Sequence, residues 1–375
     1  MKDYDVVVVG GGIAGSVAAR FSAGYGFKTL LIERFKTPRN KPCSGIQFGF
    51  FEKLVGKPIP KEKLCSNELT KVEMITPSGR SFRTGMKMLN FWRSTFDNWL
   101  NELASDAGAD FRDETIFMDF HEHPGCFKVK ILAKDGEKEI KTRYLIGADG
   151  PNSRIRRRLR PMDFGKRVSG AAVNFYFAGE GDLDPNTLYM FNNRDFCPVM
   201  FAWVYLKDDM WVIGTGSDKD QDPMGYANRF FKHVKDKYRL RGKTVKKEGF
   251  TSPLGTGIYL GHGNLLMTGD AAGFIDLYRG LGMDNAALSG RLAARSIAKA
   301  EETGRPAIQP YQRYTKGIVH TIEKNAKKQN RRFATNEALE RSFSLPNLMK
   351  MGIPMLVFAQ INKLLPPESM ILLPL

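Results

Sequence analysis

The chain has few of the residues that build disulfide frameworks or metal centres. Its 375 residues include four cysteines and five histidines. Cys43, Cys65, Cys126 and Cys197 are widely spaced and form no CxxC pair. The sequence therefore predicts neither structural disulfides nor a zinc or other metal site. Scattered free thiols are typical of a reducing compartment, so we expect a cytoplasmic protein.

Apolar runs long enough to cross a membrane are also lacking. The most apolar late stretch, residues 351–375, is interrupted by Pro354, Lys363, Pro366 and Pro367, so it is too short and too broken for a transmembrane helix. The composition, 42% hydrophobic and 26% charged, is that of an ordinary globular protein and excludes disorder and collagen-like repeats. A chain of this length has room for about two domains.

Acidic residues are too few to balance the basic ones. The 57 Lys and Arg against 40 Asp and Glu give a formal net charge of +17, which favours anionic nucleotides, nucleic acids or lipid surfaces as partners. Basic residues concentrate in segments 154–160, 232–247 and 313–350. No helix-turn-helix, zinc-finger or RNA-binding motif accompanies them, so we do not expect nucleic acid as a partner.

The C-terminal region combines basic and apolar residues. The basic stretch 313–350 leads into an apolar tail, residues 345–375. This order suggests a helix on the surface of an anionic membrane, which would place the protein peripherally on the inner face. A solvated basic face with a tail packed on the protein body explains the same pattern, and the two interpretations stay open.

The N-terminal residues predict a strand, a glycine-rich turn, a helix and a second strand. Residues 4–9 end in four consecutive β-branched valines, as expected of a central parallel strand, and residues 10–15 read Gly-Gly-Gly-Ile-Ala-Gly. In such a G-x-G-x-x-G motif Gly10 makes the tight turn and Gly12 lets the backbone approach a pyrophosphate. Gly15 allows the helix to pack closely on the sheet.

This unit predicts a dinucleotide site. A pyrophosphate is stabilised by the free N–H groups at a helix N-terminus, where Ile13 and Ala14 stand. Glu33, 18 residues after Gly15, can accept hydrogen bonds from a ribose, and Arg34 follows it. No second motif of this kind follows, so the sequence predicts one dinucleotide.

The remaining segments predict an α/β fold with a second domain. Segments 72–84 and 127–146 have the pattern of hairpins, and residues 94–107 have that of a helix. Residues 168–176 and 198–215 alternate like an antiparallel sheet. Residues 265–270 form a buried strand ending in a turn, and helices are expected over 283–302 and in 311–350.

We therefore expect three regions. A Rossmann-type dinucleotide-binding domain is discontinuous, and an α+β substrate domain is built on the antiparallel sheet. A basic helical C-terminal region carries the apolar tail. The expected ranges are 1–70, 95–165 and 255–310 for the first domain, 71–94 and 166–254 for the second, and 311–375 for the C-terminal region.

Two later segments are rich in glycine and contain an aspartate: residues 147–154, GADGPNSR, and residues 269–274, GDAAGF, followed by GLG at 280–282. They resemble the second and third fingerprints of the FAD-dependent monooxygenase and reductase superfamily, which has the para-hydroxybenzoate hydroxylase fold. The resemblance implies that the dinucleotide is FAD. It also implies a set of further cofactor-binding residues: Asp149, Gly150, Gly269, Asp270, Gly280, Gly282 and Met283.

In that superfamily the residue matching Asp270 lies near the pyrophosphate and ribityl chain. The helix opened by Gly282 points its N-terminus at the pyrimidine edge of the flavin, where it stabilises the negative charge of the reduced ring. Arg93 is similar to the superfamily's flavin-contacting arginine. Its alternative interpretation is a solvated arginine at a helix start.

Residues 41–45 read KPCSG and residues 201–206 read FAWVYL. These stretches resemble the KPCGG and Tyr-x-Trp-x-Phe-Pro segments of the geranylgeranyl reductase family, whose members saturate isoprenoid double bonds. Residues 277–282, LYRGLG, depart from its usual Pro-Leu-Thr-Gly-Glu-Gly. The resemblance implies FAD-dependent reduction of carbon–carbon double bonds in an isoprenoid or other apolar substrate. It places Phe201, Trp203 and Tyr205 in the substrate cavity, and Cys43, Ser44 and Gly45 near the isoalloxazine.

Several alternatives stay open. Cys43 could donate the proton that alkene reduction needs or assist reduction, or it could simply pack under the flavin. The electron donor is NAD(P)H or a reduced carrier. The segment at 201–205 also resembles the Trp-x-Trp-x-Ile stretch of flavin halogenases, so an FAD-dependent monooxygenase or halogenase acting on an aromatic ring is the main alternative. A non-catalytic flavin- or lipid-binding protein is the second.

Overall fold

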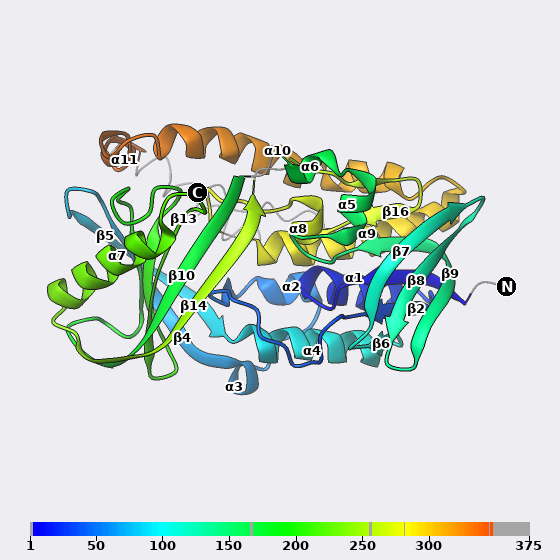
Figure 1. Ribbon diagram of the computed structural model, residues 1–375, viewed down its shortest axis with the longest axis horizontal. Coiled ribbons are helices and arrows are strands. Elements are labelled where there is room, and N and C mark those ends of the chain that lie inside the picture. The colour runs from blue at the N-terminus through cyan, green and yellow to red at the C-terminus, as the bar shows by residue number, and fades with distance from the viewer. Residues whose placement is uncertain (1–2, 166–167, 255–256, 281, 345, 348–375) are drawn as a thin grey trace.

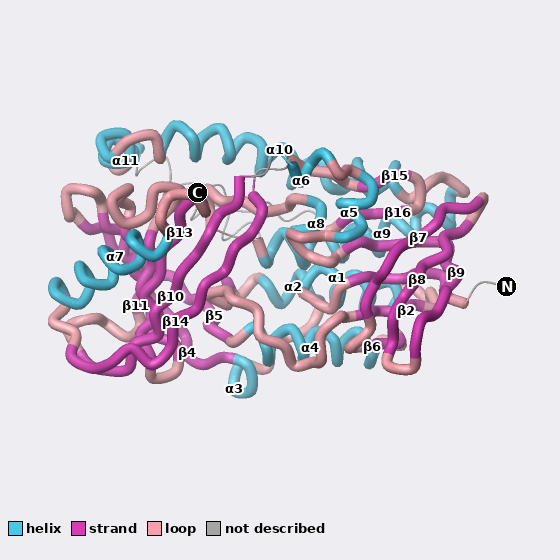
Figure 2. The backbone as a smooth tube through the Cα atoms, in the orientation of Figure 1, coloured by secondary structure: helices cyan, strands magenta, loops and turns pink. Residues whose placement is uncertain are grey.

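Two β-sheets organise the molecule. The computed structural model describes residues 3–165, 168–254, 257–280, 282–344 and 346–347. Within these residues each sheet has eight strands. Figure 1 shows one sheet with its helices towards the N-terminal end of the long axis and the other sheet at the opposite end. The tube in Figure 2 shows long strands in both halves, with helices between and above them.

The first sheet is doubly wound. Its parallel strands lie in the order β16-β9-β1-β2-β6, so β1 stands between β2 and β9 and the chain order reverses beside it. A ligand site is expected at such a switch point, beyond the carboxyl ends of the strands. The strands are β1 (Tyr4–Val9), β2 (Thr29–Ile32), β6 (Asp110–Arg112), β7 (Ile116–His123), β8 (Cys126–Ala133), β9 (Gly136–Gly147), β15 (Gly261–His262) and β16 (Leu265–Met267).

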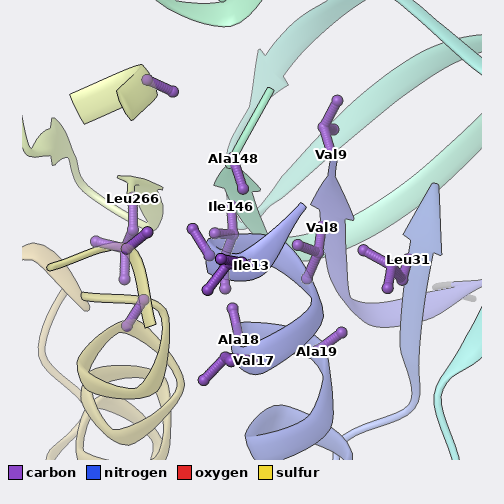
Figure 3. Close-up of a cluster of buried hydrophobic side chains, with 14 of the residues drawn as sticks. Val8, Val9, Ile13, Val17, Ala18, Ala19, Leu31, Ile146, Ala148 and Leu266 are labelled. Carbon is purple, nitrogen blue, oxygen red and sulfur yellow. The ribbon is translucent and has the colours of Figure 1, made fainter. Parts of the chain in front are cut away.

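Small side chains let the helices approach this sheet closely. The buried side of helix α1 (Ile13–Gly24) includes Ala18 and Val17, and Figure 3 shows these residues among Val8, Ile146 and other buried apolar side chains. Helix α9 (Met283–Thr303) packs on α1. A Cβ on Gly290 of α9 would lie only 2.2 Å from the Ala14 carbonyl oxygen, so the two helix backbones are in contact there.

The second sheet has the order β14-β10-β13-β12-β11-β4-β5-β3 and is antiparallel except where β4 and β11 run parallel. We call it the substrate sheet. Helix α7 (Pro223–Lys237) covers one of its faces, against β10 and β13. Its strands are β3 (Ile46–Phe48), β4 (Cys65–Ile75), β5 (Ser81–Phe91), β10 (Val168–Glu180), β11 (Thr187–Phe191), β12 (Ala202–Lys207), β13 (Met210–Asp218) and β14 (Arg241–Leu254).

Helix α10 (Ile308–Arg332) connects the two halves of the molecule. Its first turn is tied to the first sheet, where the Tyr311 hydroxyl donates to the Met267 carbonyl at 2.9 Å. Near its last turn, Gln329 donates to the Val199 carbonyl beside the substrate sheet at 2.5 Å. Figure 1 shows this helix along one side of the molecule, between α11 and the region of α6. The remaining helices are α2 (Phe51–Val55), α3 (Lys61–Leu64), α4 (Arg93–Asp106), α5 (Arg154–Leu159), α6 (Met162–Gly165), α8 (Gly269–Ala272) and α11 (Asn336–Ser342).

Most predicted elements are confirmed. The α/β class, both hairpins, the antiparallel sheet and the helices at α4 and α9 are present. The prediction of a strand over 265–270 is wrong at its end, because Gly269 and Asp270 open the short helix α8. Residues 345 and 348–375 lie outside the described residues, and with them nearly all of the predicted apolar tail.

Candidate active site

The glycine turn after β1 forms a tight cradle. Gly10 has a φ of 110°, and a Cβ there would lie 2.4 Å from the Ala148 carbonyl oxygen. A Cβ on Gly15 would lie 1.9 Å from the Gly10 carbonyl oxygen. No side chain caps the N-terminus of α1 and its first turn holds no acidic residue. The N–H groups near Ile13 and Ala14 therefore offer an anion site of the kind that binds a pyrophosphate.

Glu33 is placed beside this cradle. Its side chain is 5% exposed, and its carboxylate accepts hydrogen bonds from the Gly11 and Phe35 amides at 3.0 and 3.1 Å. Arg39 lies 3.2 Å from the same carboxylate, and a Cβ on Gly12 would meet its guanidinium at 3.1 Å. The sequence analysis did not identify Arg39. Arg34, which it did identify, is exposed and lies over the Phe35 ring.

The second fingerprint meets the glycine turn. The Cα of Asp149 is 3.0 Å from a Cβ built on Gly10. One oxygen of its carboxylate accepts from the Arg154 amide at 2.7 Å, while Oδ1 is buried without a hydrogen-bond partner among the described residues. Burial raises the pKa of this carboxyl. Gly150 follows with a φ of 79° and accepts from the Ser153 amide. A buried, unpartnered oxygen beside the cradle suits a ligand hydroxyl.

The third fingerprint closes the site from the other side. A Cβ on Gly269 would lie 2.8 Å from the Ala14 Cβ, so α8 begins directly against α1. Asp270 pairs with Lys41 at 3.4 Å, and its Oδ1 would be 3.8 Å from a Cβ on Gly282. Like α1, helix α9 has a glycine N-cap, here Gly282, and no side-chain cap. The three fingerprints, far apart in sequence, therefore converge on one place.

Cys43 lies where α9 begins. Its Sγ is 3.9 Å from the sulfur of Met283, the first residue of α9. Gly45 has a φ of 68°, and a Cβ there would be 1.8 Å from the Phe91 carbonyl oxygen, so only glycine fits between the turn and β5. On the loop before α9, a Cβ on Gly280 would lie 2.9 Å from the Phe201 ring. The Cys43 turn therefore lies between α9 and the substrate sheet.

Arg93 is buried and charged in this region. It is 5% exposed, and its guanidinium donates to both oxygens of Asp97 at 2.7 and 2.9 Å. The interpretation of Arg93 as a solvated arginine is therefore wrong; its contact with a flavin stays a prediction. Burial alone would raise the pKa of the Cys43 thiol. The Arg93 charge, a hydrogen bond from the Gly45 backbone and Lys41 outweigh it and hold that pKa below its ordinary value.

Strand β12 presents a row of three side chains towards the Cys43 turn. Trp203, Tyr205 and Lys207 share one face because alternate strand residues point the same way. Trp203 is half-exposed and donates to Asn174 at 2.9 Å, whereas Tyr205 and Lys207 are each 1% exposed. Lys207 donates to the Ser44 carbonyl and, at 3.1 Å, to the Phe91 carbonyl. The sequence analysis assigned no role to this lysine.

The two faces of the substrate sheet differ in exposure. On β11, Tyr189 and Phe191 are buried on the side of α7, while Leu188 and Met190 on the other side are half-exposed. We call this second side the apolar face. It continues to Trp92, which stacks on Tyr176 at 5.9 Å near Cys43. Its half-exposed members are Ile46, Phe48, Met74, Met86, Trp92, Leu188, Met190, Trp203 and Met210.

This geometry defines a class of protein. A phosphate cradle at the switch point of a doubly wound sheet, with a second sheet turned towards it, is the arrangement of FAD-dependent oxidoreductases with two domains. FAD fits the residues present, because the glycine cradle, the uncapped starts of α1 and α9, Glu33 and the free oxygen of Asp149 supply groups for its phosphates and hydroxyls. Residues 3–326 match the family model described as FAD binding domain.

The chain belongs to the geranylgeranyl reductase family of these FAD-dependent oxidoreductases. It is 30% identical to digeranylgeranylglycerophospholipid reductase 2 of Methanothermobacter thermautotrophicus over 86% of each chain. It is 28% identical to the chloroplastic geranylgeranyl diphosphate reductase of Nicotiana tabacum, over 82% of this chain and 68% of the relative. The crystal structure of a geranylgeranyl bacteriochlorophyll reductase-like protein from Thermoplasma acidophilum superposes with a TM-score of 0.80 at 23% identity, covering 93% and 96% of the two chains.

Proposed function

We propose that this protein reduces carbon–carbon double bonds in the prenyl chains of an isoprenoid lipid, using FAD. Membership of the geranylgeranyl reductase family supports the reaction. The observation that carries the proposal is the apolar face of the substrate sheet, which ends at the Cys43 turn beside the start of α9. Aromatic and methionine side chains such as Trp203 and Met190 suit a flexible hydrocarbon chain and exclude water from it.

Alkene reduction adds a hydride to one carbon and a proton to the other. When bound, FAD in its reduced form supplies the hydride. The residues of this chain would bind and orient the reactants. The glycine turn would hold the diphosphate, the N-terminus of α9 would stabilise the negative charge of the reduced flavin ring, and the apolar face would orient the double bond. Gly10, Gly12 and Gly15 therefore act through the cofactor, while Trp203 acts on the substrate and the buried Tyr205 supports the apolar face from below.

Cys43 is the proposed proton donor. Its Sγ–H bond breaks as a C–H bond forms at the carbon that did not receive the hydride, and the thiolate left behind takes a proton from solvent. A general acid works best when its pKa lies near the working pH. The ordinary pKa of a cysteine thiol lies above neutral pH, and the Arg93 charge helps to lower the pKa of Cys43 towards neutrality.

Product analysis under two atmospheres tests this function against a monooxygenase or halogenase. The FAD-loaded protein is reduced and mixed with an unsaturated prenyl lipid, once without oxygen and once in air with halide. We expect a product heavier by two hydrogen atoms per double bond in both cases. A product that forms only in air and contains new oxygen or halogen would contradict the proposal.

The basic face of α10 supports a peripheral position on an anionic membrane. One side of α10 is buried through residues such as Ile318 and Ile322, and its opposite side is exposed. The exposed basic residues on it are Arg313, Lys316, Lys324, Lys327 and Arg331. A stripe of this kind is attracted to anionic lipid, where an isoprenoid substrate would be dissolved. No helix among the described residues is long and apolar enough to cross a bilayer.

Flotation with anionic liposomes tests this position. The triple variant K324Q/K327Q/R331Q should lose most of its flotation, whereas the triple variant K130Q/K141Q/K243Q, with the same loss of charge at other exposed lysines, should keep it. Removal of residues 345–375 measures the part played by the predicted apolar tail. Equal flotation of the two triple variants would contradict a membrane role for α10.

The electron donor is proposed to be NAD(P)H or a reduced carrier.

A further inference from the structure

Lys207 is a buried lysine at the end of the row on β12. Its side chain is 1% exposed, and among the described residues it forms no ion pair. Its ammonium instead lies 4.6 Å from the centre of the Trp92 ring and 5.8 Å from that of Tyr205. A buried lysine is costly unless its charge is compensated, so this arrangement needs an explanation.

Two backbone carbonyls compensate the charge of Lys207. One belongs to the Cys43 turn and the other to the last residue of β5. Lys207 Nζ donates to the carbonyl of Ser44, the residue after Cys43, and to that of Phe91 on β5. Gly45 is held in the same place, because the Phe91 amide donates to its carbonyl at 3.2 Å and a Cβ on it would lie 3.2 Å from Nζ. One ammonium thus ties the turn to two strands of the substrate sheet.

The surroundings of Lys207 couple it electrostatically to Cys43. Burial lowers the pKa of Lys207 to about 8, against the opposing effect of the Cys43 thiolate. A pKa this close to neutrality leaves the ammonium largely charged at neutral pH. The titratable and charged groups that act on Lys207 or on Cys43 come from several elements: Lys41, Arg93, Tyr176, Tyr205, Asp208 and Glu248.

We propose that Lys207 is a positioning residue that fixes the Cys43–Gly45 turn against the substrate sheet and so holds the Cys43 thiol close to Arg93. The proposal rests on the function proposed for Cys43. It goes further by assigning the placement of that thiol to a residue of the substrate sheet. The position of the thiol relative to Arg93 and Met283 then depends on the same strand that carries Trp203 and Tyr205. Substrate contact and proton donation are thereby linked in one element.

The pH dependence of Cys43 alkylation tests this without any turnover. The FAD-bound protein is treated with iodoacetamide from pH 6 to pH 10, and the rate at Cys43 is read by peptide mass spectrometry. Only the thiolate reacts, so the midpoint of the profile reports the pKa of the thiol. Lys207→Met keeps the unbranched chain up to the position of Cε but removes the charge and both hydrogen bonds. We expect it to shift the midpoint upward by about one pH unit, with an about tenfold slower reaction at pH 7.

Two further variants complete the test. Lys87→Met, at an exposed position on neighbouring β5, should leave the profile of Cys43 unchanged. Lys207→Arg keeps the charge and should give a midpoint closer to wild type than Lys207→Met does. If Lys207→Met fails to fold, Lys207→Gln, which keeps one donor, replaces it and should show the same upward shift. Identical profiles for wild type and the folded neutral variant would overturn the proposal, as would a Cys43 that reacts in neither. A protein that reduces no lipid but shows the shift would disprove only the proposed function.

Discussion

Arg93 and Asp97 form a buried ion pair one turn apart on α4, with 2.7 Å between Nε and Oδ1 and both side chains less than 5% exposed. Asp97 also pairs with Arg39 at 3.2 Å, and Arg39 pairs with Glu33 at 3.2 Å. A continuous series of charges thus runs from the carboxylate beside the glycine cradle to the thiol of Cys43. The two ends of the proposed flavin site are therefore linked through protein side chains.

Removing Arg93 should be costly because it leaves part of a buried charge network uncompensated. We expect Arg93→Met to lower the free energy of unfolding by about 3 kcal/mol, the lower end for breaking a buried pair, since Arg39 still faces Asp97. Urea unfolding measures this. Lys299→Met, which breaks an exposed pair with Glu302 on α9, should leave stability unchanged. Equal stability of the two variants would argue against a structural role for the buried network.

The glycine cradle makes a prediction about cofactor content. Gly15→Ala should give a protein without bound FAD, because the new Cβ would lie 1.9 Å from the Gly10 carbonyl oxygen and force the turn open. Gly24→Ala, at the other end of α1, has no atom within 4 Å of its new Cβ and should keep the yellow colour. The ratio of flavin to protein absorbance checks both. Normal flavin content in Gly15→Ala would show that the phosphate site lies elsewhere.

The apolar face makes a prediction about substrate affinity. Met190 is half-exposed on this face. Met190→Glu should therefore place a charge against a hydrocarbon substrate. We expect KM for a prenyl lipid to rise at least about tenfold, since an unpaired charge buried against an apolar chain costs more than 1.4 kcal/mol, with flavin content unchanged. Met118→Glu, at an exposed methionine on β7 of the first sheet, is the matched control. An unchanged KM in Met190→Glu would exclude this face as the substrate surface.

Local sequence was enough to predict the strand, turn and helix at the N-terminus, because the β-branched run and the glycine spacing determine that unit by themselves. Arg39 was missed because it lies in an irregular segment without periodicity, and its partners Glu33 and Asp97 come from different elements. Lys207 was missed because a lysine at a strand end is normally solvated. Its acceptors are 163 and 116 residues away in the sequence, so only the packing of the two sheets reveals them.

A surface contact of the C-terminal region makes a prediction about pH. Glu340 of α11 accepts hydrogen bonds from Thr76, Ser78 and Arg80 in the turn between β4 and β5. Burial would raise the pKa of Glu340, but these donors lower it to about 2 from an ordinary 4.5. Because the folded pKa is lowered, the contact stabilises the protein above pH 4.5, and this contribution is lost as the pH falls from 4.5 towards 2.

Thermal unfolding of Glu340→Gln against wild type measures that contribution. The variant should melt below wild type at pH 7, and the difference should shrink as the pH falls through this window. Glu337→Gln, on the same helix, removes a carboxylate whose pKa is lowered by Thr335 rather than by the turn, and it should differ less from wild type than Glu340→Gln does at pH 7. A difference between wild type and Glu340→Gln that does not depend on pH would contradict the role given to the carboxylate.

The most direct test of the whole account is an anaerobic flavin titration. FAD-loaded protein is bleached with dithionite under nitrogen, and a detergent-dispersed unsaturated prenyl lipid or its fully saturated counterpart is then added. The account predicts that oxidised-flavin absorbance returns with the unsaturated lipid alone, while oxygen is still excluded. A flavin that stays bleached with both lipids until air is admitted would contradict it.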